Sequence, residues 1–219
     1  MNSAIVLAGG IGSRIDSEVP KQFLIINNKL VLEYSINVFD ENTNINEIIL
    51  VCNADYIETP LVQKFNQKCT IVEGGKTRTQ STINGLLACD KLTENVLIHD
   101  AARPFISKKM VNDCISNLNQ NDASIPIISC KDSLVNFKDS QVEYLDRNNI
   151  KLIQTPQGFN YKKILNALKD NNKNYSDDFS ALLDINPDAT HALFKGDYNN
   201  FKITTDTDLK LAEMISNEI

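Results

Sequence analysis

Short apolar runs alternate along the chain with longer stretches whose apolar residues recur at helical spacing. Residues 4–8 (AIVLA) and 47–52 (EIILVC) are runs of the first kind, bounded by turn residues, which is typical of buried strands. Residues 31–39 (VLEYSINVF) and 77–92 (TRTQSTINGLLACDKL) are stretches of the second kind. Strands that alternate with helices in this way indicate βαβ units around a mainly parallel sheet.

The same alternation continues to the end of the chain. Further strands are expected at 69–73, 96–100, 123–129 and 191–194, and further helices at 56–65, 110–118, 162–168, 176–184 and 206–219. Thr205 and Asp208 fit a capping box at the start of the last helix. Because crossover connections are right-handed, helices should cover both faces of the sheet, and a ligand cleft should lie at the carboxyl ends of the strands. The predicted fold is α/β, Rossmann-like, in a single domain spanning residues 1–219.

Residues 131–150 break this pattern. They contain short alternating segments and polar turns without a helical stripe, which predicts a protruding β-hairpin arm. Such an arm could be solvated, or it could pack on a second subunit. Since an isolated two-stranded hairpin is marginally stable in water, a partner surface would explain its persistence, and we expect a homodimer formed through the arm.

Composition narrows the functional classes. The 219 residues are 42% hydrophobic, which is typical of an ordered globular domain with a substantial core. The formal net charge of −6 argues against a nucleic-acid-coating surface, although local cations can still bind anionic ligands. No apolar segment has the length of a membrane span, and no signal-peptide pattern opens the chain, so we expect a cytoplasmic protein. The five scattered cysteines are interpreted as buried hydrophobic residues in a reducing compartment.

Three glycines follow the first predicted strand. Gly9, Gly10 and Gly12 allow a close approach of the backbone to a ligand, and their amides could form an anion-binding nest. The loop lacks the G-K-[S/T] ending of a Walker A motif and does not fit the G-x-G-x-x-G dinucleotide fingerprint. A tight strand-to-helix turn is the alternative interpretation. Arg14 and Lys21 favour a triphosphate ligand, although each cation taken alone could be a solvated surface residue.

Five motifs in order resemble one known family. They are LAGGIGSRIDSEVPKQFL (7–24), GGKTRTQSTINGL (74–86), VLIHDAARPF (96–105), DRNNIKLIQTPQGF (146–159) and NNFKITTDTDLKLAE (199–213). They are similar to the signature of sugar-phosphate and polyol-phosphate nucleotidyltransferases, and within it to the 2-C-methyl-D-erythritol 4-phosphate cytidylyltransferases. The resemblance covers nearly the whole chain. It implies transfer of CMP from CTP to 2-C-methyl-D-erythritol 4-phosphate, with release of pyrophosphate and formation of an isoprenoid precursor.

The resemblance also implies roles for individual residues. Arg14, Lys21 and Lys202 would be catalytic, as fixed charges around the reacting phosphates. The implied nucleotide-binding residues are Leu7, Ala8, Gly9, Gly10, Gly12, Gly74, Arg78, Ser81, Asp100 and Ala101. The implied acceptor-binding residues are Arg103, Ser133, Arg147 and Thr155, with Arg147 reaching the neighbouring subunit's site. Mg²⁺ or another divalent cation would be held mostly by CTP phosphates, with Asp100 nearby.

Several of these residues have simpler explanations. His99 fits a structural histidine with satisfied hydrogen bonds, and Asp100 could form a salt bridge with Arg103. The pair Asp177 and Asp178 fits a helix cap better than a metal site.

One departure from the family pattern concerns the acceptor. Leu134 and Val135 stand where the family often has a lysine, in the region implied to bind the polyol. Ribitol-5-phosphate cytidylyltransferase, serving wall or capsule polymers, is therefore the nearest alternative. A catalytically silent nucleotide-binding protein is a second alternative. The joint presence of four basic residues argues against it, namely Arg14, Lys21, Arg147 and Lys202. A dinucleotide-binding oxidoreductase is set aside, because its fingerprint is missing.

Overall fold

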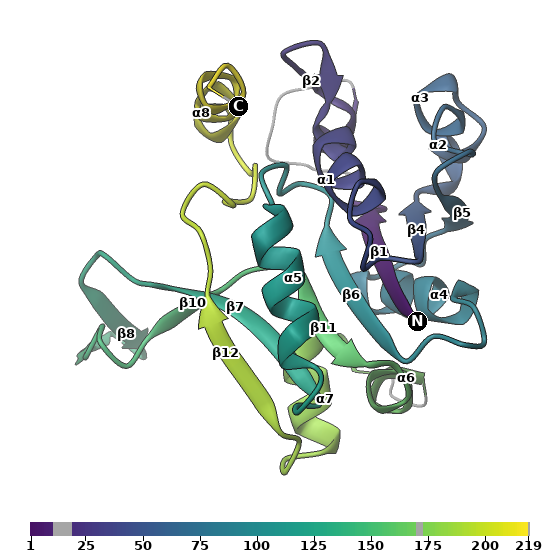
Figure 1. Ribbon diagram of the computed structural model, residues 1–219. Helices are drawn as coiled ribbons and strands as arrows, with labels where there is room; N and C mark the ends of the chain where they lie inside the picture. The colour runs from purple at the N-terminus through teal and green to yellow at the C-terminus, as the bar shows by residue number, and fades with distance from the viewer. Residues whose placement is uncertain (11–18, 170–172, 219) are drawn as a thin grey trace.

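One central sheet organises the molecule. The computed structural model describes residues 1–10, 19–169 and 173–218. Its eight-stranded sheet has the order β10-β7-β11-β6-β1-β4-β5, with β12 also paired to β7 (Figure 1). The strands are β1 (Asn2–Ala8), β4 (Glu47–Cys52), β5 (Thr70–Glu73), β6 (Asn95–Asp100), β7 (Ala123–Ser129), β10 (Lys151–Ile153), β11 (Gln157–Asn160) and β12 (His191–Lys195). The α/β fold predicted from the apolar pattern is confirmed.

The sheet is mainly parallel, with an antiparallel insertion. β1 runs parallel to both neighbours, so that Ile5 lies opposite Ile49 of β4 and Ile98 of β6. β11 is antiparallel to β6 and to β7, and β10 is antiparallel to β7. The sequence pattern did not predict that insertion. Gly158 lets Cys114 pack closely against β11, because a Cβ at position 158 would lie 2.6 Å from the sulfur of Cys114.

Helices cover both faces of the sheet, as predicted. α1 (Val31–Asp40), α3 (Pro60–Gln63) and α5 (Lys108–Asn117) pack on one face, and α4 (Arg78–Ala88), α6 (Tyr161–Lys169) and α7 (Asp178–Ile185) on the other. The alternation along β1 explains the two layers, since Ala4 and Val6 join the first core and Ile5 joins the second. Burial of each large apolar side chain in these cores contributes about 1.5–3 kcal/mol.

One predicted helix is divided in two. The single helix expected over 56–65 is replaced by α2 (Ala54–Ile57) and α3. Thr59 has extended backbone angles (φ −77°, ψ 151°) because it precedes Pro60, which opens α3.

The carboxyl-terminal helix packs beside a small β-ribbon. α8 (Asp206–Ser216) begins at Thr205 with the predicted capping box, in which Asp208 is the reciprocal partner. It contacts β2 (Ile25–Ile26), which pairs with β3 (Lys29–Leu30) just after the 3₁₀ turn η1 (Lys21–Phe23). In the residues that the structure describes, no helix is both long enough and apolar enough to cross a membrane.

The predicted arm is present. β8 (Leu134–Lys138) and β9 (Gln141–Leu145) form a two-stranded sheet that projects from the body (Figure 1). Asp139 and Ser140 both have positive φ, at 52° and 64°, as a tight two-residue hairpin turn requires. Apart from the half-buried Leu134, the residues of both strands are exposed. The arm therefore adds little to the core of its own chain.

Candidate active site

The first glycine loop lies at the carboxyl end of β1. Gln22 of η1 is buried, and its side-chain amide donates to the backbone oxygens of Ala8 (2.6 Å) and Gly10 (2.8 Å). These bonds tie the P-K-Q segment to the loop and place Lys21 beside it. Sequence reasoning assigned a role to Lys21 and overlooked Gln22, although both stand in the same motif. Gly12 and Arg14 lie outside the described residues.

A second glycine turn lies next to the first. Gly74 donates its amide to the Cys52 oxygen (2.7 Å) at the end of β4, and the Gly75 amide donates to Ser81 Oγ (3.0 Å). Ser81 sits between the two turns, because a Cβ built on Gly9 would lie 3.5 Å from its Oγ and one on Gly74 would lie 3.1 Å away. A larger side chain at Gly74 would crowd Ser81, whereas a Cβ at Gly9 would only be in ordinary contact with it, and the backbone groups of both turns line a common edge of the sheet.

Four charged side chains form a chain of ion pairs beside these turns. Lys202 Nζ contacts Asp100 Oδ2 at 2.7 Å, and Arg78 Nε contacts Asp100 Oδ1 at 3.3 Å. Arg78 Nη2 then contacts Asp178 Oδ2 at 2.8 Å. Arg78 opens α4, Asp100 ends β6, Asp178 opens α7, and Lys202 follows β12. The fold therefore pairs charges that are up to 102 positions apart in sequence.

The ion pairs control the charge of Asp100. Burial alone would raise its pKa, but Arg78 and Lys202 outweigh burial and hold the pKa of this carboxyl well below its usual range. Burial likewise opposes the charge of Arg78, and the carboxylates of Asp178 and Asp100 outweigh it and raise the guanidinium pKa. Asp100 and Arg78 therefore both stay ionised at neutral pH. The predicted helix cap at 177–178 is confirmed for Asp177, which accepts from the Ser180 amide (3.0 Å).

A buried chain of hydrogen bonds through Thr155 and His99 holds the backbone of Asp100 in place. The Asp100 amide donates to Thr155 Oγ1 (3.1 Å), Thr155 Oγ1 lies 2.9 Å from His99 Nδ1, and His99 Nε2 lies 3.0 Å from the Arg103 oxygen. A carbonyl can only accept, so Nε2 carries the proton and Nδ1 accepts from Thr155. Burial lowers the pKa of His99 to about 4, which keeps the ring neutral. His99 is therefore the structural histidine that the simpler explanation proposed.

The predicted salt bridge between Asp100 and Arg103 is not formed. Arg103 Nη1 donates instead to the Asn200 oxygen (2.9 Å), while Arg78 and Lys202 occupy the Asp100 carboxylate. Among the nucleotide-binding candidates, Ala101 is buried and its amide donates to the Leu7 oxygen (3.0 Å), which joins the ends of β6 and β1.

The structure does not bring the two arm candidates to this cluster within one chain. Ser133 and Arg147 are exposed at the base of the arm, which points away from the body (Figure 1). Arg147 Nη1 donates to the Lys131 oxygen (3.0 Å), also at that base. Thr155 is buried, and its hydroxyl is engaged by His99 and Asp100. Their roles in acceptor binding stay predictions.

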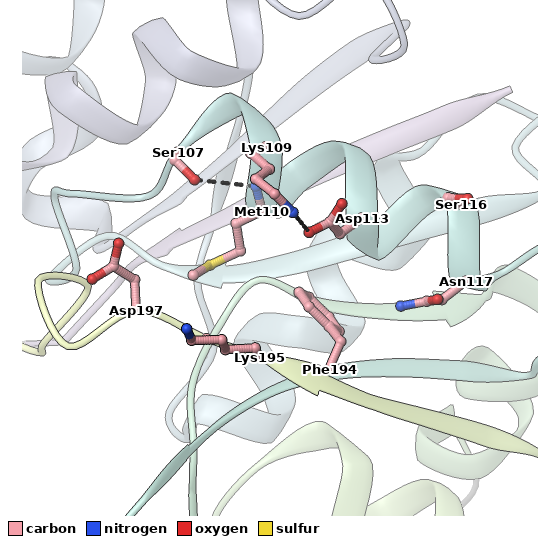
Figure 2. A pocket seen from close by; sticks show the side chains of 10 residues that line it. Ser107, Lys109, Met110, Asp113, Ser116, Asn117, Phe194, Lys195 and Asp197 are labelled. Carbon is pink, nitrogen blue, oxygen red and sulfur yellow. Dashed lines mark hydrogen bonds and ion pairs between the residues drawn. The ribbon is translucent and has the colours of Figure 1, made fainter.

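A separate groove lies outside this site. Its volume is about 390 Å³, and α5 and the end of β12 line it with Ser107, Lys109, Met110, Asp113, Ser116, Asn117, Phe194, Lys195, Gly196 and Asp197 (Figure 2). Lys109 is paired there with Asp113 at 2.5 Å. The groove contains none of the predicted site residues.

Comparisons with known proteins assign the chain to a family. The family model described as 2-C-methyl-D-erythritol 4-phosphate cytidylyltransferase matches residues 2–218. Curated proteins of that name from Clostridium botulinum and Thermotoga neapolitana are 41% and 34% identical to the chain, over 98% and 100% of it and 96% and 98% of their own lengths. A crystal structure of 4-diphosphocytidyl-2C-methyl-D-erythritol synthase from Anaerococcus prevotii superposes with a TM-score of 0.86 at 31% identity, covering 99% of this chain and 98% of that one. The chain belongs to the 2-C-methyl-D-erythritol 4-phosphate cytidylyltransferase family, and it is a nucleotidyltransferase.

Proposed function

We propose that this chain transfers CMP from CTP to 2-C-methyl-D-erythritol 4-phosphate, releasing pyrophosphate and giving 4-diphosphocytidyl-2-C-methyl-D-erythritol. The observation that carries the proposal is the convergence of Lys202, Asp100 and Arg78 beside two glycine turns at the carboxyl edge of the sheet. Ligands of open α/β sheets bind at that edge. The family membership of the whole chain supports the same reaction.

The reaction needs charge and alignment more than it needs a base. A phosphate oxygen of the acceptor attacks the α-phosphorus of CTP in line, a new P–O bond forms, and the bond from that phosphorus to the bridging oxygen breaks. The nucleophile is already an anion, so no proton has to be removed from it. The barrier comes from repulsion between two anions and from charge on the leaving pyrophosphate, which positioning and fixed cations lower.

We assign the stabilisation of the reacting phosphates to the positive charges of Lys202, Lys21 and Arg14. Arg78 has a different role, because its charge is balanced by Asp178 and Asp100, so it orients Asp100 more than it neutralises phosphate. Backbone groups of Gly74 and Gly75, held by Ser81, would recognise the base. Lys202 must exchange its contact with Asp100 for a phosphate oxygen as substrate binds.

We propose that the divalent cation binds together with CTP, mostly through the phosphates of the nucleotide. The described residues contain no group of three or more His, Cys, Asp or Glu side chains that could enclose a metal ion. Mg²⁺ commonly binds through one or two carboxylates plus substrate phosphates, and Asp100 can supply one such carboxylate. When bound, Mg²⁺ would neutralise charge on the triphosphate.

The arm supports a homodimer. Val135, Phe137, Val142 and Tyr144 are exposed on it by 47%, 69%, 58% and 79%. Apolar side chains on an otherwise unsupported two-stranded sheet favour burial against a second copy. In such a dimer Arg147 would reach the acceptor phosphate of the partner's site.

Pyrophosphate release from CTP tests the function. We expect release with 2-C-methyl-D-erythritol 4-phosphate and little with ribitol 5-phosphate, and little when UTP or ATP replaces CTP. Faster release with ribitol 5-phosphate would overturn the acceptor assignment and leave the reaction type intact. Binding of CTP without release by either acceptor would show a silent nucleotide-binding protein.

A further inference from the structure

Two buried amide side chains cross-link the segments that carry Asp100 and Lys202. Gln154 follows β10, and its Nε2 donates to the backbone oxygens of Asp197 (2.7 Å) and Asn200 (3.2 Å), while its Oε1 accepts from the Asp197 amide (3.1 Å). Asn200 returns the contact, because its Nδ2 donates to the Thr155 oxygen (2.8 Å). Both side chains are almost fully buried. We call this pair the amide clamp.

One side of the amide clamp leads to Lys202. Asn200 stands two residues before Lys202, and the Ile203 amide just after it donates to the Ala102 oxygen (2.8 Å). Arg103 adds a bond to the Asn200 oxygen (2.9 Å). Hydrogen bonds at Asn200 and Ile203 therefore hold the backbone on both sides of Lys202, and the Lys202 Nζ lies 2.7 Å from Asp100 Oδ2.

The other side leads to Asp100. Thr155, the residue after Gln154, accepts the Asp100 amide through its hydroxyl and gives its carbonyl to Asn200. The 154–155 turn therefore contacts both the carboxylate-bearing strand end and the lysine-bearing loop. These contacts join protein groups to one another, so we expect Gln154 and Asn200 to affect the chemistry through the positions of Asp100 and Lys202.

Close packing adds a second constraint on Gln154. Gly196 faces its Oε1 so closely that a Cβ at that position would collide with the oxygen. The outer side of the same loop borders the groove of Figure 2, where Gly196 and Asp197 are lining residues. The amide clamp holds this loop from the inside, together with the Gly196 amide bond to the Ile127 oxygen (2.8 Å).

We infer that Gln154 and Asn200 are positioning residues that set the placement of Lys202 against Asp100 for nucleotidyl transfer. The inference rests on the proposed function, since it assigns Lys202 to the reacting phosphate. A misplacement of about 1 Å in a reacting group can lower the rate about 10²-fold. Loss of either amide should therefore lower kcat far more than it changes KM for CTP.

The test is a double-mutant cycle with Lys202→Ala. Gln154→Met keeps an unbranched side chain of similar size and removes the polar contacts, and Asn200→Ala removes the bond to Thr155. Each should lower kcat by about 10- to 100-fold in the parent and by less than about twofold in the Lys202→Ala background, because effects that act through one residue are not additive. Asn42→Ala is the matched control, since Asn42 is another buried amide, bonded to Asn112 (3.1 Å).

The inference would be overturned if each variant lowered kcat by the same factor in the parent and in the Lys202→Ala background, or if Asn42→Ala lowered kcat as much as they do. Either result would mean that the amides act only on overall stability. A crystal structure of Gln154→Met is a readout independent of activity. We expect the Lys202 Nζ to leave Asp100 Oδ2, and an unchanged contact there would overturn the inference. If the parent protein proves inactive, the proposed function fails and this structural comparison alone decides the role of the amide clamp.

Discussion

Replacing Lys202 by alanine separates its contribution to stability from its contribution to catalysis. Its Nζ lies 2.7 Å from Asp100 Oδ2, which at an effective dielectric constant of about 20 corresponds to a gross attraction of about 6 kcal/mol. The lysine side chain is 36% exposed, however, so water screens the pair and ordering of the side chain opposes it. Pairs of this kind contribute about 0.2–1 kcal/mol net.

The catalytic contribution should be larger. A preorganised positive group at the reacting phosphate is typically associated with a 10²–10³-fold effect on turnover, or about 2.7–4 kcal/mol. Lys202→Ala should therefore lower kcat by that factor. In a chain of this length, a loss of up to about 1 kcal/mol should lower Tm by no more than about 4 °C.

Pyrophosphate release and thermal unfolding should be measured on the same preparation. Lys210→Ala is the matched control, because Lys210 is an exposed lysine on α8, and it should leave both quantities close to the parent's. Turnover of Lys202→Ala within about threefold of the parent would refute the role assigned to this charge. A fall in Tm of more than about 10 °C would refute the claim that the ion pair contributes little to folding.

Three further predictions concern the neighbouring groups and the arm. Arg78→Met should lower the free energy of unfolding by about 3–5 kcal/mol, because it leaves the Asp178 carboxylate, whose side chain is 2% exposed, without its partner. Urea unfolding measures this quantity, and a loss below about 1 kcal/mol would contradict the prediction. The pKa of His99 falls from 6.5 to about 4 on folding, so between these values the unfolded chain binds the extra proton and stability decreases as pH falls. That decrease is about 3 kcal/mol, measured without nucleotide or divalent cation, and His99→Gln should make it shallower. Phe137→Asp should convert a dimer to a monomer in sedimentation equilibrium, whereas Lys138→Ala should not; a dimeric Phe137→Asp protein would argue against assembly through the arm.

Local signals in the sequence were sufficient for the main elements. The apolar run at 4–8, the helical spacing in 31–39, the capping box at Thr205 and the hairpin at 131–150 depend on residues that are neighbours along the chain. Such patterns report directly which side chains share a face, so the α/β class and the position of the glycine loop could be predicted.

The contacts within the site could not be predicted in the same way. Asp100 had several cations available in sequence, and Arg103, three residues away, was the nearest of them; it binds Asn200 instead. Gln154 gave no sequence signal of its role, because a lone glutamine between a strand and a turn has no local partner to mark it.

The sequence by itself determined the alternation of the main strands and helices, the glycine turns, the arm and the set of charges available for phosphate chemistry. Only the tertiary structure decided which charges meet, because Arg78 and Asp178 are 100 positions apart and pair only where two helix starts converge on one sheet edge. It also decided that β11 enters the sheet antiparallel between β6 and β7. The physical reason is that periodicity is a property of neighbouring residues, whereas an ion pair depends on desolvation and approach geometry that the packing of distant segments creates.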